Sequence, residues 1–279
     1  MPGLYVVATP IGNLEDITLR ALRVLKEVDL IACEDTRQTQ KLLNHFGITT
    51  RTVSYYEQNE ASRSKELVNE LTAGKRIALV TDAGMPGISD PGFRVVALAI
   101  EHGIQVVPIP GATAMISALA ASGLQTDSFQ FRGFLPPKSG QRRKALEGIR
   151  NSQQTEIFYE APHRLKEAIE DVVAELGDSR SIVIARELTK IHEEFLRGHA
   201  AQVLKELNSR GEIKGEITLL IGKAVEDQSA AHHQESVRER VRQIMAEQNL
   251  DEKAGLKIVA KERGISKSDA YRELQRNKK

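Results

Sequence analysis

Short apolar segments alternate with helical patterns through the first half of this 279-residue chain, and this alternation limits the possible folds more than any other feature. Residues 4–8, 30–33, 77–81 and 106–109 are apolar and partly β-branched, which is typical of buried strands. The segments between them have helical spacing, for example residues 36–46. Strands that alternate with helices predict βαβ crossovers and a largely parallel sheet, so the fold class is α/β.

The alternation breaks near Gly123 and then starts again with further apolar segments. We therefore expect two α/β subdomains, residues 1–120 and 121–225, with the boundary inside 118–126. New strands are predicted at 129–134, 156–159, 182–185 and 216–221. In the first subdomain, Pro108 cannot donate a hydrogen bond to a neighbouring strand, so its strand belongs at a sheet edge.

The last part of the chain, residues 236–279, has helical patterns only. A second helix is expected over 251–263, and Ser266 with Asp269 forms a capping-box pattern that opens a third. Three short helices with a turn at Gly264 predict a helix-turn-helix-like domain, although such units also pack on proteins. Residues 224–236 are polar and predict a linker.

Composition excludes several classes of protein. With 41% hydrophobic and 28% charged residues, the chain does not match disordered, collagen-like or coiled-coil sequences. One cysteine, Cys33, cannot form an internal disulfide. The longest apolar runs fall short of the roughly 18 residues of a membrane span, and the first residues lead into a strand rather than a signal peptide. These features predict a soluble, cytoplasmic protein without a membrane partner.

The net charge of +1 conceals an uneven distribution. Residues 236–279 hold 12 Lys and Arg against 7 Asp and Glu, a net charge of +5, and the remainder carries −4. A basic tail on an acidic body favours a polyanionic partner. A solvated helical surface would explain the same charges.

Unusual loops follow several of the predicted strands, and ligands bind at this edge of open α/β sheets. The loop at 9–13 has one glycine and is no dinucleotide fingerprint, and no Walker pattern occurs, which argues against NAD chemistry and nucleotide hydrolysis. In residues 34–37, Asp35 or Thr36 can cap the helix that follows. Alternatively, the opposite charges of Asp35 and Arg37 at the end of a strand can orient a substrate. Residues 81–92 combine three glycines with two prolines, which permits close approach of a ligand to the backbone.

Two charged segments in the second half follow apolar strands, at 158–164 and 185–190. They predict either substrate-binding groups or a network of ion pairs on a helix face. The histidines of the chain lack the spacing of metal ligands relative to carboxylates, so no metal is expected.

Taken together, the motifs Thr9–Thr18, Glu34–Arg37, Ser89–Gly92, Phe158–Arg164 and Arg186–Lys190 resemble the bacterial ribosomal RNA small-subunit methyltransferase I family. That family is the ribose 2′-O-methylating branch of the tetrapyrrole-methylase superfamily. The similarity covers about residues 3–222. It implies a class III methyltransferase fold, two α/β subdomains with S-adenosylmethionine in the cleft between them, and commonly a homodimer.

The resemblance also assigns cofactor contacts and a substrate. The cofactor-binding positions it implies are Ile11, Asp82, Gly84, Met85, Thr113, Ala114, Tyr159, Ala185 and Gly215. The expected substrate is the ribose 2′-hydroxyl of a decoding-centre cytidine in small-subunit rRNA, either naked or in the assembled subunit, and not DNA.

Methyl transfer to a weakly acidic hydroxyl needs a base near the oxygen and groups that stabilise charge. Asp35, Glu187 and Lys190 are the catalytic candidates, and Arg37, His163, Arg164 and Arg186 are the candidates for binding RNA phosphates. Two alternatives stay open: a tetrapyrrole-type small-molecule methylase, and a non-enzymatic RNA-binding assembly protein.

Overall fold

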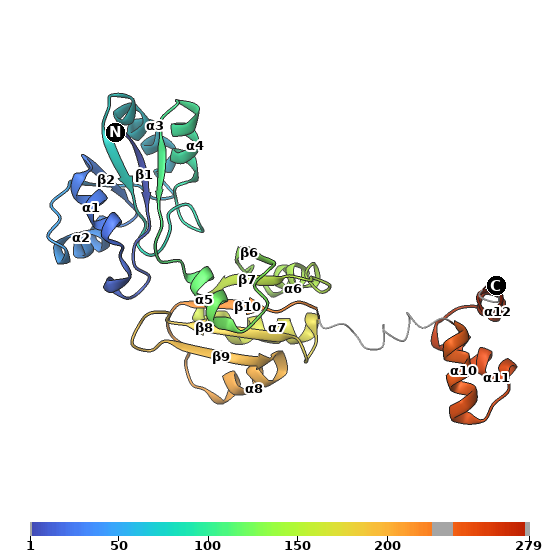
Figure 1. Ribbon diagram of the computed structural model, residues 1–279. Helices are drawn as coiled ribbons and strands as arrows, with labels where there is room; N and C mark the ends of the chain where they lie inside the picture. Colours follow the sequence, from blue (N-terminus) through green and yellow to red (C-terminus); the bar gives the residue numbers. More distant parts are fainter. Residues whose placement is uncertain (1, 225–236, 277–279) are drawn as a thin grey trace. The chain divides into compact units, whose positions relative to one another are not determined.

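The computed structural model describes residues 2–224 and 237–276 (Figure 1). The chain divides after Ala224 into two compact units. The first unit is an α/β body with two sheets, and the second consists of helices. The predicted linker at 224–236 lies, apart from Ala224, outside the described residues.

A five-stranded parallel sheet forms the first half of the α/β body, in the order β3-β2-β4-β1-β5. Its strands are β1 Gly3–Val7, β2 Leu30–Cys33, β3 Thr52–Ser54, β4 Arg76–Leu79 and β5 Val106–Ile109. The parallel sheet and the edge position of Pro108 are confirmed. The sequence did not reveal β3, because this edge strand has only three residues and no buried position.

Helices cover both faces of this sheet, as Figure 1 shows. They are α1 Leu19–Glu27, α2 Thr36–His45, α3 Glu60–Thr72 and α4 Phe93–Glu101. The helices α1 and α2 pack on one face through Leu25 and Leu43, and α3 and α4 pack on the other through Leu67 and Val95. With both faces of the sheet covered, the central strands β1, β2 and β4 are largely apolar and buried, and most polar residues lie in the loops at their ends.

The second sheet has the order β6-β7-β10-β8-β9, with β6 and β7 parallel and the other pairs antiparallel. Its strands are β6 Phe129–Phe134, β7 Thr155–Glu160, β8 Ser181–Arg186, β9 Glu194–His199 and β10 Ile217–Ile221. One face is covered by α6 Ser139–Glu147, α7 Leu165–Leu176 and α8 Ala200–Ser209. The strand β9 was missed because it is polar at both ends.

The other face of the second sheet packs against α5 Ala114–Ser122 and against a loop of the first sheet. Ile11, from the loop after β1, shares one buried cluster with Ala185 and Leu188. This cluster joins the two halves of the α/β body next to the loops that follow β1 and β8. The predicted boundary between 1–120 and 121–225 falls within α5 and stays a prediction.

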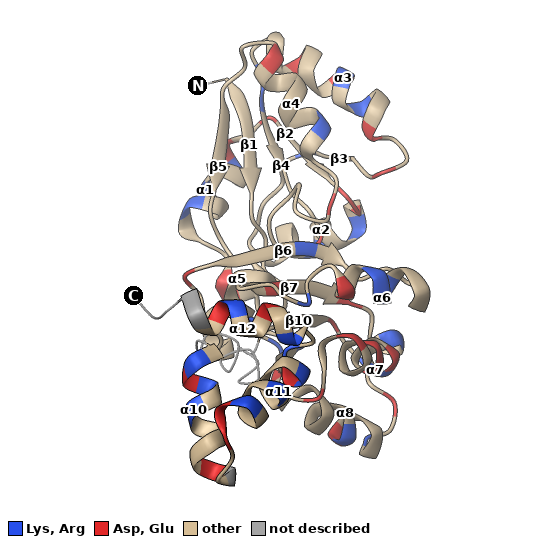
Figure 2. Cartoon of the chain, turned by 90° about the vertical axis from the view of Figure 1, so that its right-hand side faces the viewer, with Lys and Arg blue, Asp and Glu red and all other residues tan. Residues whose placement is uncertain are grey.

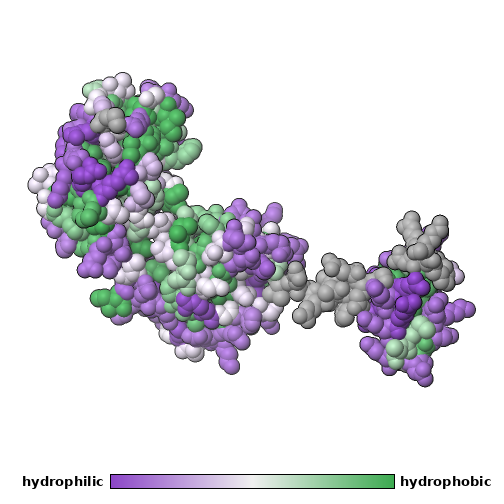
Figure 3. Space-filling model, viewed as in Figure 1, coloured by the Kyte–Doolittle hydropathy of each residue, from purple (hydrophilic) through white to green (hydrophobic). Residues whose placement is uncertain are grey.

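The second unit consists of α10 Val237–Gln248, α11 Glu252–Glu262 and α12 Lys267–Arg276. These helices bury their own core, which includes Val241, Ile244 and Val259. The predicted cap of the third helix is present, since the amide of Asp269 donates to Oγ of Ser266 at 3.2 Å. Figure 2 shows residues of both charge signs along these helices, and Figure 3 shows a mostly hydrophilic surface on them in this view.

Candidate active site

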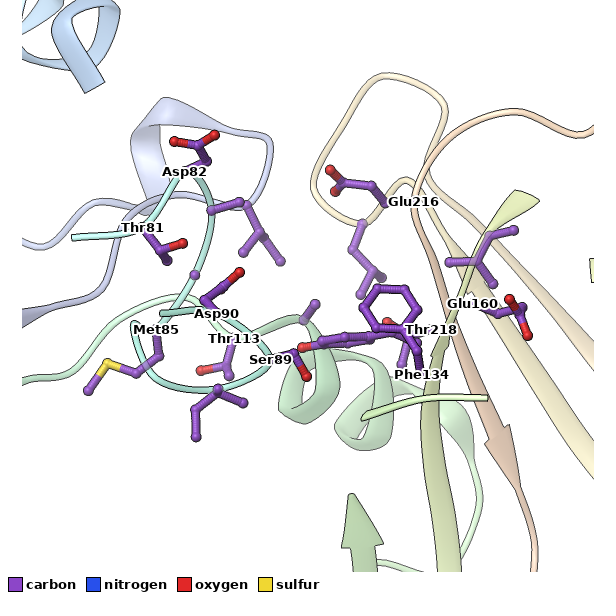
Figure 4. A pocket seen from close by; sticks show the side chains of 18 of the residues that line it. Thr81, Asp82, Met85, Ser89, Asp90, Thr113, Phe134, Glu160, Glu216 and Thr218 are labelled. Carbon is purple, nitrogen blue, oxygen red and sulfur yellow. The ribbon is translucent and has the colours of Figure 1, made fainter. Parts of the chain in front are cut away.

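A cavity of about 430 Å³ lies in the α/β body between loops of the two sheets. We call it the acidic pocket. In Figure 4, Thr81, Asp82 and Asp90 lie on the first-sheet side of the pocket, and Phe134, Thr218 and Glu216 lie on the second-sheet side. Its volume is that of a site for a small molecule or cofactor.

The lining of the acidic pocket has an uneven charge. It contains five carboxylates and, among the described residues, no lysine, arginine or histidine. The carboxylates are Glu34, Asp82, Asp90, Glu160 and Glu216. Apolar side chains complete the lining, among them Ile11, Met85, Ile88 and Leu188. This combination suits a ligand that is cationic and carries apolar surface.

Hydrogen bonds between loops hold the first-sheet side of the pocket in place. The backbones of Thr9 and Gly84 exchange two hydrogen bonds, at 2.9 and 3.1 Å. The hydroxyl of Thr81 donates to Glu34 at 3.0 Å, and the amide of Asp35 donates to Asp82 at 3.2 Å. Gly84 has a φ of +85°, a conformation that glycine adopts without strain, so the loop can turn back toward Thr9.

Burial changes the acidity of two of these carboxyl groups. Burial, together with the negative charge of Glu34, raises the pKa of Asp90 to about 6. Burial also raises the pKa of Asp82, against the effect of the amide of Asp35. A carboxylate with a pKa near the working pH is suited to accepting a proton during a reaction.

Aromatic rings form part of the second-sheet side. The ring of Tyr159 packs edge-on against Phe131 and Phe134, with centroid distances of 4.9 and 5.7 Å. Burial raises the pKa of the Tyr159 hydroxyl, which therefore stays protonated as a hydrogen-bond donor. Tyr159 and Phe134 line the pocket and give it a rigid apolar wall.

The loop after β8 has a strained backbone. Glu187 and Thr189 have φ angles of +51° and +65°, values that residues other than glycine rarely adopt. The loop packs closely on the loop after β1, since a Cβ added to Gly12 would lie 2.9 Å from Oγ1 of Thr189. Strain of this kind is retained where a precise loop position matters, here the position of Leu188 in the pocket.

All nine residues predicted to bind the cofactor line this one pocket. They are Ile11, Asp82, Gly84, Met85, Thr113, Ala114, Tyr159, Ala185 and Gly215. They come from both sheets and from segments up to about two hundred residues apart in sequence. The structure thus brings the predicted set together, and its role in binding stays a prediction.

The three predicted catalytic residues lie beside the pocket and not in its lining. Asp35 caps α2 and forms a bidentate ion pair with Arg37, which lowers the pKa of Asp35 to about 2. Glu187 pairs with Lys190 at 2.8 Å, and Lys190 also contacts Glu216 at 3.1 Å. These charges hold loops together, so their catalytic role stays a prediction that the geometry does not favour.

The four predicted RNA-binding residues have different surroundings. Arg164 pairs with buried Glu160 at 2.7 Å, and Arg186 pairs with Glu194 at 3.1 Å. His163 is exposed, and the side chain of Arg37 is 87% exposed. Of the four, Arg37 and His163 are the ones whose side chains are open to a partner.

The sequence analysis missed the carboxylates Glu34, Asp90, Glu160 and Glu216 as pocket residues. All four stand inside or next to the motifs that it singled out, at the end of a strand or in the glycine-rich loop. The available signal was position alone, because a carboxylate in a loop looks the same whether it faces a pocket or water.

Two further properties concern metals and membranes. In residues 2–224 and 237–276, no group of three or more His, Cys, Asp or Glu side chains is arranged to hold a metal ion. No helix within these ranges combines the length and the apolar character that crossing a membrane requires.

Comparisons with known proteins identify similar chains. The family model for Tetrapyrrole (Corrin/Porphyrin) Methylases matches residues 3–204. A protein of Halalkalibacterium halodurans named ribosomal RNA small subunit methyltransferase I is 51% identical over 271 residues, which cover 96% of this chain and 93% of the relative. A Bacillus subtilis protein of the same name is 43% identical over 272 residues, covering 96% and 92%.

Solved structures share the fold at low identity. A diphthine synthase matches with a TM-score of 0.63 and 16% identity, covering 78% of this chain and 89% of that one. A uroporphyrin-III-C-methyltransferase from Thermus thermophilus matches with a TM-score of 0.56 and 19% identity, covering 81% and 96%. At these identities the similarity shows the fold, and the two-sheet α/β architecture predicted from the sequence is confirmed.

Proposed function

Because this chain belongs to the tetrapyrrole (corrin/porphyrin) methylase family and, within it, to the ribosomal RNA small subunit methyltransferase I group, we propose that it methylates small-subunit rRNA with S-adenosylmethionine as methyl donor. The observation that carries the cofactor assignment is the charge of the acidic pocket. Glu34, Asp82 and Asp90 line a partly apolar cavity and have no cationic partner among the described residues, so this side of the pocket is complementary to a ligand that carries a sulfonium and an ammonium group.

The residues present fit this cofactor. When bound, S-adenosylmethionine supplies an electrophilic methyl group on a positively charged sulfur. Ile11, Met85 and Leu188 offer apolar surface for its adenosine part, and Asp82 stands among the carboxylates that suit its positive charges. The first turn of α5, at Thr113 and Ala114, presents amide groups that have no acceptor within the helix, and such amides can bind a carboxylate.

For the acceptor, we propose the ribose 2′-hydroxyl of a cytidine, as the resemblance of the motifs implies. A hydroxyl is a weak acid, so transfer is helped by a group that takes its proton as the new bond forms. Asp90 is the best placed candidate, because it lines the pocket and its pKa of about 6 leaves it ionised but basic near neutral pH. In this role its carboxylate oxygen accepts the hydroxyl proton.

The neighbours of Asp90 have supporting roles in this proposal. Thr81 and Glu34 are hydrogen-bonded to one another and keep the loop ends fixed. The ion pair of Glu187 with Lys190 positions the loop that carries Leu188. Closure of the pocket by these loops orients the two reactants, which contributes much of the rate of a transfer reaction.

We further propose that the protein acts as a homodimer in the cytoplasm. Helix α4 supports the dimer, since it exposes 79% of Phe93 and 63% of Ile100, and Figure 3 shows a hydrophobic area over this helix. Exposed apolar surface of this kind favours association. One chain has a mass of 30.9 kDa, and light scattering of the purified protein should give twice this mass.

A paired assay tests the function. Calorimetry should show binding of S-adenosylmethionine, and labelled methyl groups should be transferred to small-subunit rRNA, with 2′-O-methylcytidine found after digestion to nucleosides. Naked rRNA and the assembled subunit are compared as substrates. Labelling of a uroporphyrinogen instead would support a small-molecule methylase, and failure to bind the cofactor would support a non-enzymatic RNA-binding protein.

A further inference from the structure

A second hollow lies along α2, outside the acidic pocket. It has a volume of about 450 Å³, and we call it the α2 groove. Its lining comes from one face of α2 and from the edge strand β3. The residues are Thr36, Arg37, Gln40, Lys41, Asn44 and Thr52.

The lining of the α2 groove is polar and positive. Among the described residues that form it there are two cations, two amides and two hydroxyls, with no carboxylate and no large apolar side chain. Lys41 donates to the neutral amide of Gln38 at 3.0 Å, and the amides of Gln40 and Asn44 are joined at 2.8 Å. Cations and amides along a surface groove suit the phosphates and hydroxyls of a nucleic-acid backbone.

The α2 groove begins beside the acidic pocket. Glu34 lines the pocket, and Thr36 and Arg37, two and three residues further on, line the groove. From Arg37 to Asn44 the helix rises about 10 Å at ~1.5 Å per residue. This length is enough for about three nucleotides spaced at ~3.4 Å.

An RNA strand that places a ribose in the acidic pocket needs cations close to it. The pocket itself repels phosphates, since its carboxylates are negative. On the second-sheet side, the cations Arg164, Arg186 and Lys190 are engaged in ion pairs with glutamates. Compared with these three cations, Arg37 in the α2 groove is more accessible, since its side chain is 87% exposed.

Arg37 is accessible, and its present partner, Asp35, can be replaced by a phosphate. Its side chain is 87% exposed, and its ion pair with Asp35 lies at the surface. Exposed pairs contribute little free energy, so a phosphate can replace Asp35 at small cost. Asp35 would then compete with the phosphate for Arg37.

We propose that the α2 groove binds the sugar-phosphate backbone of the RNA next to the nucleotide that is methylated, with Arg37 and Lys41 contacting phosphates. This inference rests on the proposed function, because it assumes that RNA is the substrate. It adds a binding surface that extends from the acidic pocket along α2 to β3.

Two substitutions in the full-length protein test the groove in opposite directions. Lys41→Gln should weaken RNA binding about threefold to tenfold and reduce the slope of log affinity against log salt by roughly 0.7 to 0.9. Asp35→Asn should strengthen RNA binding at low salt, because it frees Arg37, and asparagine caps a helix as well as aspartate does. The matched control is Lys65→Gln, on α3 at the opposite face of the sheet, which should change neither quantity.

Cofactor binding is measured on the same proteins to separate the two proposals. Unchanged affinity for S-adenosylmethionine in all variants, with the RNA effects above, supports the groove. If the wild-type protein methylates rRNA but Lys41→Gln and Asp35→Asn behave as Lys65→Gln does, the groove proposal is overturned and the function stands. If the wild-type protein neither binds the cofactor nor labels RNA, the proposed function itself fails.

Discussion

The carboxylates that the two sheets contribute to the acidic pocket differ in their partners. At the first sheet, Glu34, Asp82 and Asp90 form no ion pair within the described part of the chain. Glu34 accepts a hydrogen bond from a hydroxyl and Asp82 accepts one from a backbone amide, while Asp90 is close enough to Glu34 to be affected by its charge. At the second sheet, carboxylates pair with arginines or lysines, as in Glu160 with Arg164 and Asp171 with Arg142.

This difference separates charges that stabilise the fold from charges that are available for function. Unpaired carboxylates in one pocket repel each other and are partly desolvated, so they cost stability and are suited to a ligand that neutralises them. Paired and buried carboxylates neutralise the cations beside them, so removal of one leaves a buried charge without its partner and lowers stability. We expect substitutions at the second sheet to affect stability and those at the first to affect binding.

The largest effect is expected at the second sheet. Asp171→Asn should lower the free energy of unfolding by about 3 kcal/mol, because Arg142, which is 1% exposed, loses the carboxylate 2.7 Å from its Nε. Urea denaturation measures this change. Glu206→Gln, which breaks the exposed pair with Arg210, is the control and should cost less than about 1 kcal/mol. A cofactor affinity that falls while stability is kept would contradict the comparison.

The next effect concerns the first sheet. Asp82→Lys should weaken S-adenosylmethionine binding by about a hundredfold or more, roughly 2.7 kcal/mol, because it reverses a charge in a pocket proposed to hold a cation. Stability should change little, since Asp82 has no ion pair among the described residues and loses one hydrogen bond at the surface, from the amide of Asp35. Asp178→Lys, at an exposed position outside the pocket lining, serves as control in the same calorimetric titration. Equal cofactor affinities of the two variants would show that Asp82 does not belong to the cofactor site.

Asp90 gives a prediction that depends on pH. Its pKa is raised to about 6 from the value of 3.8 that is usual for an aspartate, so the folded protein binds more protons than the unfolded chain between these values. Stability should therefore fall as pH rises through this window. Asp90→Asn removes the charge and should stabilise the protein at pH 8 by about 1–2 kcal/mol, after allowance for solvent screening.

The same variant tests the proposed base. Below about pH 4 the stability difference between Asp90→Asn and wild type should disappear, because both side chains are then neutral. The rise of wild-type kcat/KM near pH 6 should be absent in the variant. A variant that keeps the wild-type pH profile would show that another group takes the proton.

The smallest effect is expected outside both sheets. On α11, Lys253, Lys257 and Lys261 are exposed and spaced four residues apart, on one side of the helix. Replacing all three by glutamine should reduce RNA affinity at low salt about tenfold or less and make its salt dependence shallower. Cofactor affinity should be unchanged, since none of them lines the acidic pocket. An unaltered salt dependence would place the RNA contacts on the α/β body alone.

The sequence determined the elements that have strong local patterns. The strands β2, β5 and β6 were predicted with the bounds that the structure shows. The strand β2 is a continuous apolar run that is buried throughout, and β6 alternates aromatic with other residues, so each has a local pattern typical of a strand. The short edge strand β3 and the polar strand β9 have no such pattern. They form because their backbones pair with the neighbouring strands β2 and β8.

The same distinction holds for the site. The motifs located the loops, and the residues carried over from the family resemblance, such as Ile11, Asp82 and Tyr159, meet in one pocket. Which charges are available was decided by the folded structure, through local pairing within loops and through burial against distant segments. Asp35, Glu187 and Lys190 look like catalytic groups in sequence, yet each has a partner within a few residues, while Asp90 owes its raised pKa to burial and to Glu34, which is far away along the chain. Residue type and order are written in the sequence, but the pairing and desolvation of a charge depend on which segments fold against it.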